Sequence, residues 1–144
     1  MAAVDLGARR IGVAVSDGSA TLASPRGTVR RSGDPEADRR AVAALVLEAG
    51  AGHVVVGLPL SLDGRRGPAA RAAVAEATAL GALLATDGVT VETYDERFTT
   101  VSAERALAEA GRVGRARRAV VDETAAAVLL QAWLDAHPPG PVPR

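Results

Sequence analysis

The apolar residues of this chain form short β-type runs in its first third. Residues 2–6 and 11–16 are two such runs, separated by a segment containing Gly7, which predicts a β-hairpin. A third strand is expected within residues 21–31, although Pro25 weakens the signal because proline cannot donate to a sheet. The pattern predicts an opening antiparallel meander.

Helix and strand signals alternate from Asp34 onward. Asp34 and Pro35 suit the N-cap and first residue of a helix, and apolar residues at helical spacing follow as far as Gly50. The later elements are expected to be a buried strand 53–57, a helix 68–86, a strand 89–94, a helix from Thr99 or Thr100 to Gly111, an Arg-rich connector 112–118 and a last helix 120–136. This order predicts an α/β fold of three layers, a mixed five-stranded sheet with helices on both faces.

The length of 144 residues fits one domain. We expect the domain to span residues 1–136 and a Pro-rich tail to span 137–144. The N-terminus lacks the basic and apolar regions of a signal peptide, and no uncharged apolar run reaches the roughly 20 residues of a membrane helix. These features indicate a soluble, cytoplasmic protein.

The residue inventory excludes several kinds of site. The chain has no cysteine, and its two histidines, His53 and His137, lack the spacing of a zinc enzyme. A bound metal would therefore need oxygen ligands. Only Tyr94, Phe98 and Trp133 are aromatic, which disfavours domains that stack successive bases on several exposed rings.

All 17 positive charges are arginines, and 17 acids balance them. Several arginines occur in pairs, and the planar guanidinium suits bidentate contacts with phosphate. The alternative is a biased composition in which the paired arginines are solvated surface. Composition alone favours the solvated surface.

Three acids carry the candidate chemistry. Asp5 lies within an apolar strand, where a carboxylate is costly to bury unless it is paired, hydrogen-bonded or bound to metal. Glu96 follows a strand, where α/β sheets place ligand-binding residues. Asp122 shares a helical stripe with Ala126 and Leu129. The alternatives are a turn role for Asp5, a surface ion pair of Glu96 with its neighbouring arginine, and an N-terminal cap for Asp122.

Convergent carboxylates are the ligands that hard divalent metal ions require. Mg²⁺ takes oxygen ligands, and two ions about 4 Å apart can activate water and stabilise the leaving oxygen of a phosphodiester. If Asp5, Glu96 and Asp122 converge, the sequence therefore predicts a Mg²⁺ or Mn²⁺ site for phosphodiester hydrolysis.

Four sequence blocks resemble the YqgF family, also called RuvX, whose members are described as candidate Holliday junction resolvases and pre-16S ribosomal RNA nucleases. The blocks are Asp5-Leu6-Gly7 with Arg10-Ile11-Gly12-Val13-Ala14-Val15-Ser16-Asp17, then Gly57-Leu58-Pro59-Leu60 with Asp63-Gly64, then Asp95-Glu96-Arg97-Phe98-Thr99-Thr100, and Asp122 with Ala125-Ala126, Leu129-Leu130-Gln131 and Leu134-Asp135. The resemblance implies a ribonuclease H-like fold and an acidic metal site of Asp5, Glu96 and Asp122.

Two further sets of residues belong to this hypothesis. In the usual sheet order of this fold, one strand separates the strand that ends at Asp95 from the first strand, so Glu96 must reach across that strand to meet Asp5. Asp95 and Asp17 are the reserve metal ligands if Glu96 does not reach. The arginines expected to hold substrate phosphates are Arg10, Arg97, Arg112, Arg115, Arg117 and Arg118. Relatives often carry lysine before the last acid, and arginine preserves that charge.

The expected function is nuclease processing of pre-16S ribosomal RNA. One alternative is a Holliday junction resolvase acting on branched DNA, and another is a non-catalytic protein that binds nucleic acid or the ribosome. A third is the sugar-kinase and actin-like ATPase group, whose phosphate loops also begin Asp-x-Gly. That group needs two such domains, and 144 residues supply one.

Overall fold

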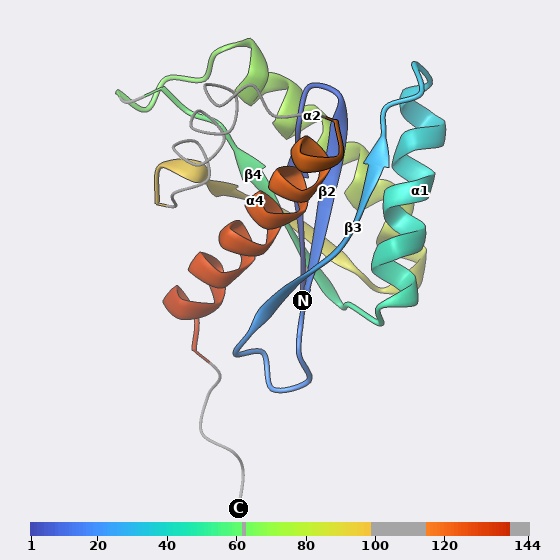
Figure 1. Cartoon of the computed structure of the whole chain (residues 1–144), viewed down its shortest axis with the longest axis vertical. Helices are drawn as coiled ribbons and strands as arrows, with labels where there is room; N and C mark the ends of the chain where they lie inside the picture. The colour runs from blue at the N-terminus through green and yellow to red at the C-terminus, as the bar shows by residue number, and fades with distance from the viewer. Residues whose placement is uncertain (62, 99–114, 139–144) are drawn as a thin grey trace, which may run out of the picture.

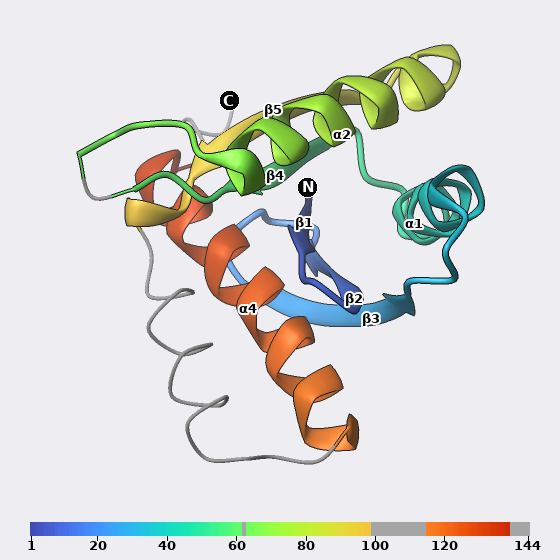
Figure 2. The same cartoon turned by 90° about the horizontal axis from the view of Figure 1, so that it is seen from above.

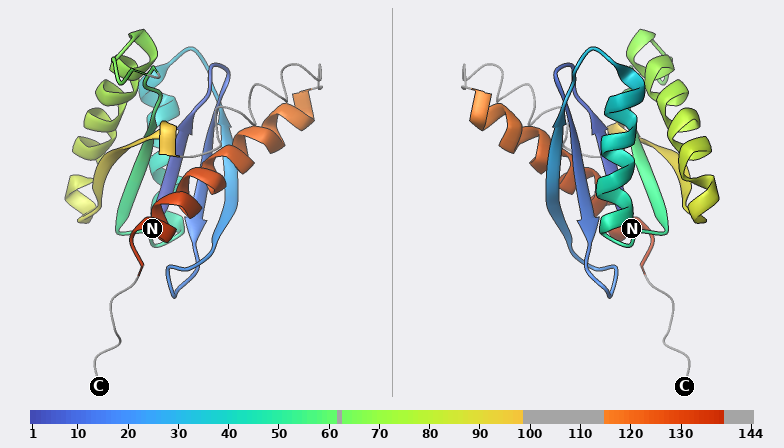
Figure 3. Two further views of the ribbon diagram at one scale, coloured as in Figure 1. Left: turned by 90° about the vertical axis from the view of Figure 1, so that its left-hand side faces the viewer. Right: turned by 90° about the vertical axis from the view of Figure 1, so that its right-hand side faces the viewer.

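The computed structural model describes residues 1–61, 63–98 and 115–138, with the side chains of residues 98 and 115–124 left out. Its elements are β1 (Ala2–Leu6), β2 (Arg10–Ser16), β3 (Ala23–Arg30), α1 (Pro35–Glu48), β4 (His53–Leu58), α2 (Pro68–Leu84), η1 (Ala85–Asp87), β5 (Thr90–Asp95), η2 (Glu96–Phe98) and α4 (Arg115–Ala136) (Figure 1). The strands form one mixed sheet in the order β3-β2-β1-β4-β5. Helices α1 and α2 cover one face and α4 covers the other (Figures 2 and 3). The predicted three-layer α/β fold is confirmed.

Strand directions bring several chain segments to one end of the sheet. β1, β2 and β3 form the predicted antiparallel meander, while β4 runs parallel to β1 and β5 runs parallel to β4. One edge of the sheet therefore holds the C-terminal ends of the parallel strands β1, β4 and β5. The start of β2 and the end of β3 lie at the same edge. We call this end of the sheet the carboxyl edge.

The two sheet faces bury different residues because side chains alternate along each strand. Ala2 and Val4 of β1 belong to the core beneath α1 and α2. Ala3 belongs to the core beneath α4, together with Val55 of β4 and Leu129 of α4. The period-two alternation places Asp5 on this α4 face, beside Ala3.

Helix α1 begins as the sequence predicts. The Asp34 side chain accepts hydrogen bonds from the backbone N–H groups of Glu36, at 3.1 Å, and Ala37, at 3.3 Å. Pro35 occupies the start of the helix, where a missing N–H costs nothing.

Helix α4 begins at Arg115, earlier than the expected start near residue 120. Part of the expected connector, including Arg115, Arg117 and Arg118, is therefore helical. The physical reason is composition, because alanine and arginine are strong helix formers and neither glycine nor proline interrupts residues 115–120. Three expected features lie outside the described residues. They are the helix from Thr99 or Thr100 to Gly111, the residue Arg112, and residues 139–144 of the tail.

The segment Pro68–Asp87 is long and apolar enough to cross a membrane by length and composition. In this fold it comprises α2 and η1, and its buried stripe, which includes Leu80 and Leu84, packs against the sheet. Its Glu76 forms a bidentate ion pair with Arg39 of α1, with N–O distances of 2.8 and 2.9 Å. The apolar stripe serves as the packing face of a helix that covers a sheet.

Candidate active site

Asp5 is a fully buried carboxylate near the carboxyl edge, with 0% of its surface exposed. It pairs with Gly12 of β2 and lies on the α4 face of the central strand β1. Burying a charged carboxylate is costly unless charge or hydrogen bonding compensates it. The turn role considered from the sequence does not describe Asp5, because it is the fourth of five residues in a paired strand.

Glu96 reaches back over the strand that neighbours its own. It follows β5, yet a Cβ atom built on Gly57 of β4 would lie only 2.6 Å from its Oε1 atom. The same Cβ position is 3.2 Å from Cδ2 of Leu129, so the carboxylate lies on the α4 face. Only 5% of Glu96 is exposed. The absence of a side chain at Gly57 makes room for this carboxylate.

The sheet order brings Glu96 towards Asp5. Val4 pairs with Val56 in the parallel β1–β4 ladder, so Asp5 and Gly57 are the next positions along the two strands. Adjacent strands lie about 4.8 Å apart. β5 lies one place away from β1, and Glu96 spans the intervening strand by lying over Gly57. Two of the three expected acids therefore approach each other on one sheet face.

Asp122 lies well inside α4, about two turns after Arg115. It therefore does not cap the helix, which removes the alternative considered for it from the sequence. By helical period it precedes the buried residues Ala125, Ala126 and Leu129, which pack on the α4 face of the sheet. Its side chain lies outside the described part of the structure.

Asp95 is held by Arg97. The Nε atom of Arg97 is 3.1 Å from Oδ1 and 2.9 Å from Oδ2 of Asp95, and NH2 is 2.6 Å from Oδ2. These hydrogen bonds lower the pKa of Asp95 and raise that of Arg97. The guanidinium also lies beside Gly64, whose ideal Cβ would be 3.3 Å from NH1. Arg97 thus forms an ion pair with Asp95, the residue before Glu96.

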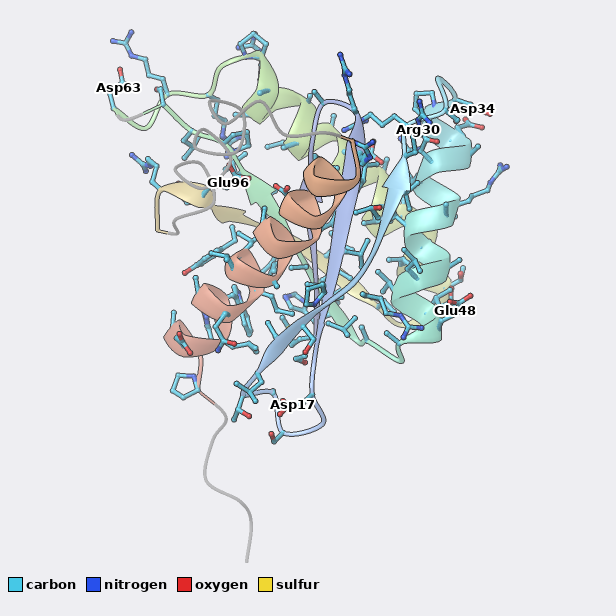
Figure 4. The ribbon with its side chains drawn as sticks, viewed as in Figure 1. Asp17, Arg30, Asp34, Glu48, Asp63 and Glu96 are labelled. Carbon is cyan, nitrogen blue, oxygen red and sulfur yellow. The ribbon has the colours of Figure 1, made fainter. Side chains whose placement is uncertain are left out.

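The reserve ligand Asp17 lies at the other end of the sheet from Glu96 (Figure 4). It follows β2, and its Oδ1 accepts hydrogen bonds from the backbone N–H groups of Thr21, at 2.9 Å, and Leu22, at 3.2 Å. Backbone hydrogen bonds from these two residues lower the pKa of Asp17 to about 2. Asp17 organises the β2–β3 turn and is not brought to the carboxyl edge.

Two arginines stand on the same sheet face as Asp5. Arg10 opens β2 and pairs directly with Arg30 at the end of β3. Strand alternation from Gly12, the partner of Asp5, places both on the α4 face at the carboxyl edge. Like charges directly opposite each other destabilise a sheet unless an anion lies nearby. Arg10 was expected here, whereas Arg30 was missed because only the strand register reveals its position.

The remaining expected phosphate ligands are only partly located. Arg115, Arg117 and Arg118 lie in the first turn of α4, and their side chains are outside the described set. Arg97 lies beside Glu96 in η2, with its charge directed to Asp95.

The chemistry of the described acids suits a hard metal ion. Asp5 and Glu96 supply buried carboxylate oxygens, the ligands that Mg²⁺ and Mn²⁺ prefer. The absence of a side chain at Gly57 lets the Glu96 carboxylate lie on the sheet face that also carries Asp5. Among the residues whose side chains are described, no group of three or more potential ligands gathers. A third protein ligand would have to come from elsewhere in the chain, and Asp122 is the expected one.

Both histidines lie away from the carboxyl edge. His53 opens β4, and its Nε2 is 3.2 Å from Oε1 of Glu92. His137 follows α4 and stacks on Trp133, with ring centroids 4.0 Å apart. They contribute to a surface cluster at the C-terminal end of α4.

Comparison with solved structures supports the fold. The chain is similar to a structure described as "T. thermophilus RuvC in complex with Holliday junction substrate", with a TM-score of 0.58 and 18% sequence identity. The match covers 96% of each chain. At this identity the likeness concerns the fold alone, and it confirms the ribonuclease H-like fold.

Comparison with sequences identifies the family. A chain of Myxococcus xanthus named "Putative pre-16S rRNA nuclease" is 48% identical, covering 94% of this chain and 87% of that one. A chain of the same name from Thermobifida fusca is 51% identical, covering 96% and 91%. The profile of the RuvX family, described as "Holliday junction resolvase", matches residues 1–136. These matches, together with the ribonuclease H-like fold, show that the chain belongs to the RuvX family.

Proposed function

We propose that this protein is a metal-dependent nuclease that cleaves phosphodiester bonds in precursor 16S ribosomal RNA. The observation that carries the proposal is the position of the Glu96 carboxylate over Gly57, one strand away from the buried Asp5. Two buried carboxylates on the same face of adjacent strand positions favour a bound cation. The names of the relatives from Myxococcus xanthus and Thermobifida fusca support the choice of substrate.

Asp5 and Glu96 are the described residues that would hold the metal, and Asp122 is the proposed third ligand. A bound Mg²⁺ or Mn²⁺ would supply Lewis-acid stabilisation of the reacting phosphate and a more acidic water. The protein fixes the carboxylates on the paired strand β1 and on the turn after β5, between the sheet and α4. This rigid support limits the rearrangement needed during reaction.

Arg10 and Arg30 would hold substrate phosphates beside these acids. Their opposed positions on β2 and β3 place two guanidinium groups on the same sheet face as Asp5. A phosphate group offsets the mutual repulsion of two arginines and accepts bidentate hydrogen bonds from each. Because phosphate contacts carry no base identity, they would position the strand without selecting its sequence.

Branched DNA is the second candidate substrate, because the matching family is described as Holliday junction resolvase. The full chain is incubated under single-turnover conditions with a precursor 16S ribosomal RNA fragment and, separately, with a four-way DNA junction. We expect metal-dependent cleavage of the RNA with Mg²⁺ or Mn²⁺, and no cleavage after chelation. Selective cleavage of the junction would assign the second function.

A matched variant separates chemistry from binding in this experiment. Glu96→Gln should lose cleavage of the RNA while it still binds that RNA in filter assays, because the arginines remain. Metal-independent cleavage, or cleavage of neither nucleic acid, would contradict the proposal. RNA binding without cleavage would instead support a non-catalytic RNA-binding role.

A further inference from the structure

A cleft of about 480 Å³ opens at the carboxyl edge, on the side of the sheet covered by α1 and α2. This volume falls within the roughly 300–1,000 Å³ of small-molecule sites. Leu6, Pro35 and Pro59 contribute apolar walls, and Ala72 and Ala73 of α2 form another side. Glu96 also lines the cleft, so the cleft adjoins the candidate active site.

Arg31 gives the rim of the cleft a fixed positive charge. Its Nε donates a 2.8 Å hydrogen bond to the carbonyl oxygen of Gly7, in the turn after β1. Its backbone N–H donates a 2.9 Å hydrogen bond to the carbonyl oxygen of Arg9. These bonds hold Arg31 at the cleft, and they do not use the NH1 and NH2 groups of its guanidinium. A planar, positioned guanidinium suits a phosphate group.

Glu76 of α2, which also lines the cleft, supplies a fixed hydrogen-bond acceptor. Its two carboxylate oxygens accept hydrogen bonds of 2.8 and 2.9 Å from Nε and NH2 of Arg39, and its side chain is 25% exposed. Each oxygen has a further lone pair, so the exposed side can accept a hydrogen bond from a ligand. An amino group is a suitable donor, whereas a carbonyl group would be repelled.

We propose that this cleft binds one unpaired nucleotide of the substrate strand, with its phosphate on Arg31 and an amino-bearing base between the apolar walls near Glu76. The inference rests on the proposed nuclease function and specifies its substrate as a strand with a splayed nucleotide next to the cleavage point. Proteins commonly read unpaired RNA bases in pockets by hydrogen bonding and packing. The strand would cross the carboxyl edge from Arg10 and Arg30 on one face to Arg31 on the other.

Calorimetric titration of the full chain with nucleoside monophosphates tests the cleft without requiring metal or cleavage. We expect AMP to bind more tightly than adenosine, because of Arg31, and more tightly than purine riboside 5′-monophosphate, which lacks the amino group that would donate to Glu76. Ala72→Leu should weaken AMP binding about tenfold by filling the cleft. Ala75→Leu is the control, because Ala75 is an exposed position on the same helix that does not line the cleft.

Arg31→Gln supplies a second variant that leaves α2 unchanged. It should remove the preference for AMP over adenosine, while Arg26→Gln should keep that preference. Equal AMP affinity in Ala72→Leu and Ala75→Leu, or no measurable AMP binding to the wild type, would overturn the cleft proposal. Metal-dependent RNA cleavage in the same preparation would leave the proposed nuclease function standing, and its absence would count against that function separately.

Discussion

Gly57 sets how closely Glu96 approaches the central strands. A methyl group at this position would lie 2.6 Å from Oε1 of Glu96 and 3.2 Å from Cδ2 of Leu129. Contacts this short force a neighbouring group to move. The glycine is therefore required here by the position of a carboxylate, and its lack of a side chain matters more than its conformational freedom.

Replacing Gly57 by alanine should displace the Glu96 carboxylate and slow RNA cleavage while RNA binding stays near the wild-type level. Overpacking should also reduce the free energy of unfolding by about 1–3 kcal/mol. Cleavage rates, filter binding and urea unfolding measure the three effects. Gly52→Ala is the control, because a Cβ atom there would meet nothing within 4 Å. Equal cleavage by both variants would contradict this role of Gly57.

At the scale of elements, the β2–β3 turn depends on the ionised Asp17 side chain. Its folded pKa, about 2, lies below the ordinary 3.8 because Thr21 and Leu22 donate backbone hydrogen bonds to the carboxylate. A lowered folded pKa means that ionisation stabilises the folded state above about pH 4. This contribution is lost as the pH falls from about 4 towards 2.

Asp17→Asn should therefore lower the melting temperature at pH 7 and have a smaller effect near pH 2. The amide resembles the protonated acid in shape and charge, so the melting temperatures of the two chains should converge when Asp17 is protonated. Thermal unfolding of both chains from pH 2 to 7 measures the difference. A difference that grows as the pH falls would show that the ionised carboxylate does not stabilise the turn.

The elements themselves were largely predictable from local patterns. Short apolar β-type runs predicted the strands, and Asp34 with Pro35 predicted the start of α1. The start of α4 was misplaced because the charge of Arg115, Arg117 and Arg118 suggested a connector, although their helix propensity is high. That difference moves Asp122 from the first turn into the body of the helix and changes its interpretation.

At the scale of the whole molecule, the candidate site depends on contacts that sequence spacing does not specify. Asp5 and Glu96 could be selected from the sequence and the family resemblance. Strand order and register produce three features of the site. They are the position of Glu96 over Gly57, the pairing of Arg10 with Arg30, and the cleft beside Arg31. These are tertiary properties, so a local pattern could not reveal them.

Binding of nucleic acid should weaken with salt despite a formal net charge of zero. Arginines near the carboxyl edge and in the first turn of α4 form local positive charge, and binding releases counterions from the phosphates. The Arg117→Ala and Arg118→Ala double variant should bind unrelated sequences less tightly and with a shallower salt slope. Each lost phosphate contact changes the slope by about 0.9 on duplex DNA.

Filter binding of a structured RNA and a four-way DNA junction across a salt series measures this effect. The double variant Arg26→Ala and Arg40→Ala is the control, since both arginines lie on the surface and form long ion pairs with Glu48 and Glu36. If the double variant of Arg117 and Arg118 binds with the wild-type salt slope, these two arginines do not contact phosphates and are solvated surface residues.

Single-turnover cleavage of precursor 16S ribosomal RNA by wild type and Asp5→Asn, in Mg²⁺, tests most directly whether Asp5 and Glu96 belong to one metal-dependent nuclease site. Circular dichroism and thermal unfolding first establish that the variant folds, and relief of carboxylate repulsion should raise its melting temperature without metal. We predict that cleavage by the folded variant falls at least about a hundredfold. Cleavage by folded Asp5→Asn at the wild-type rate would contradict the account.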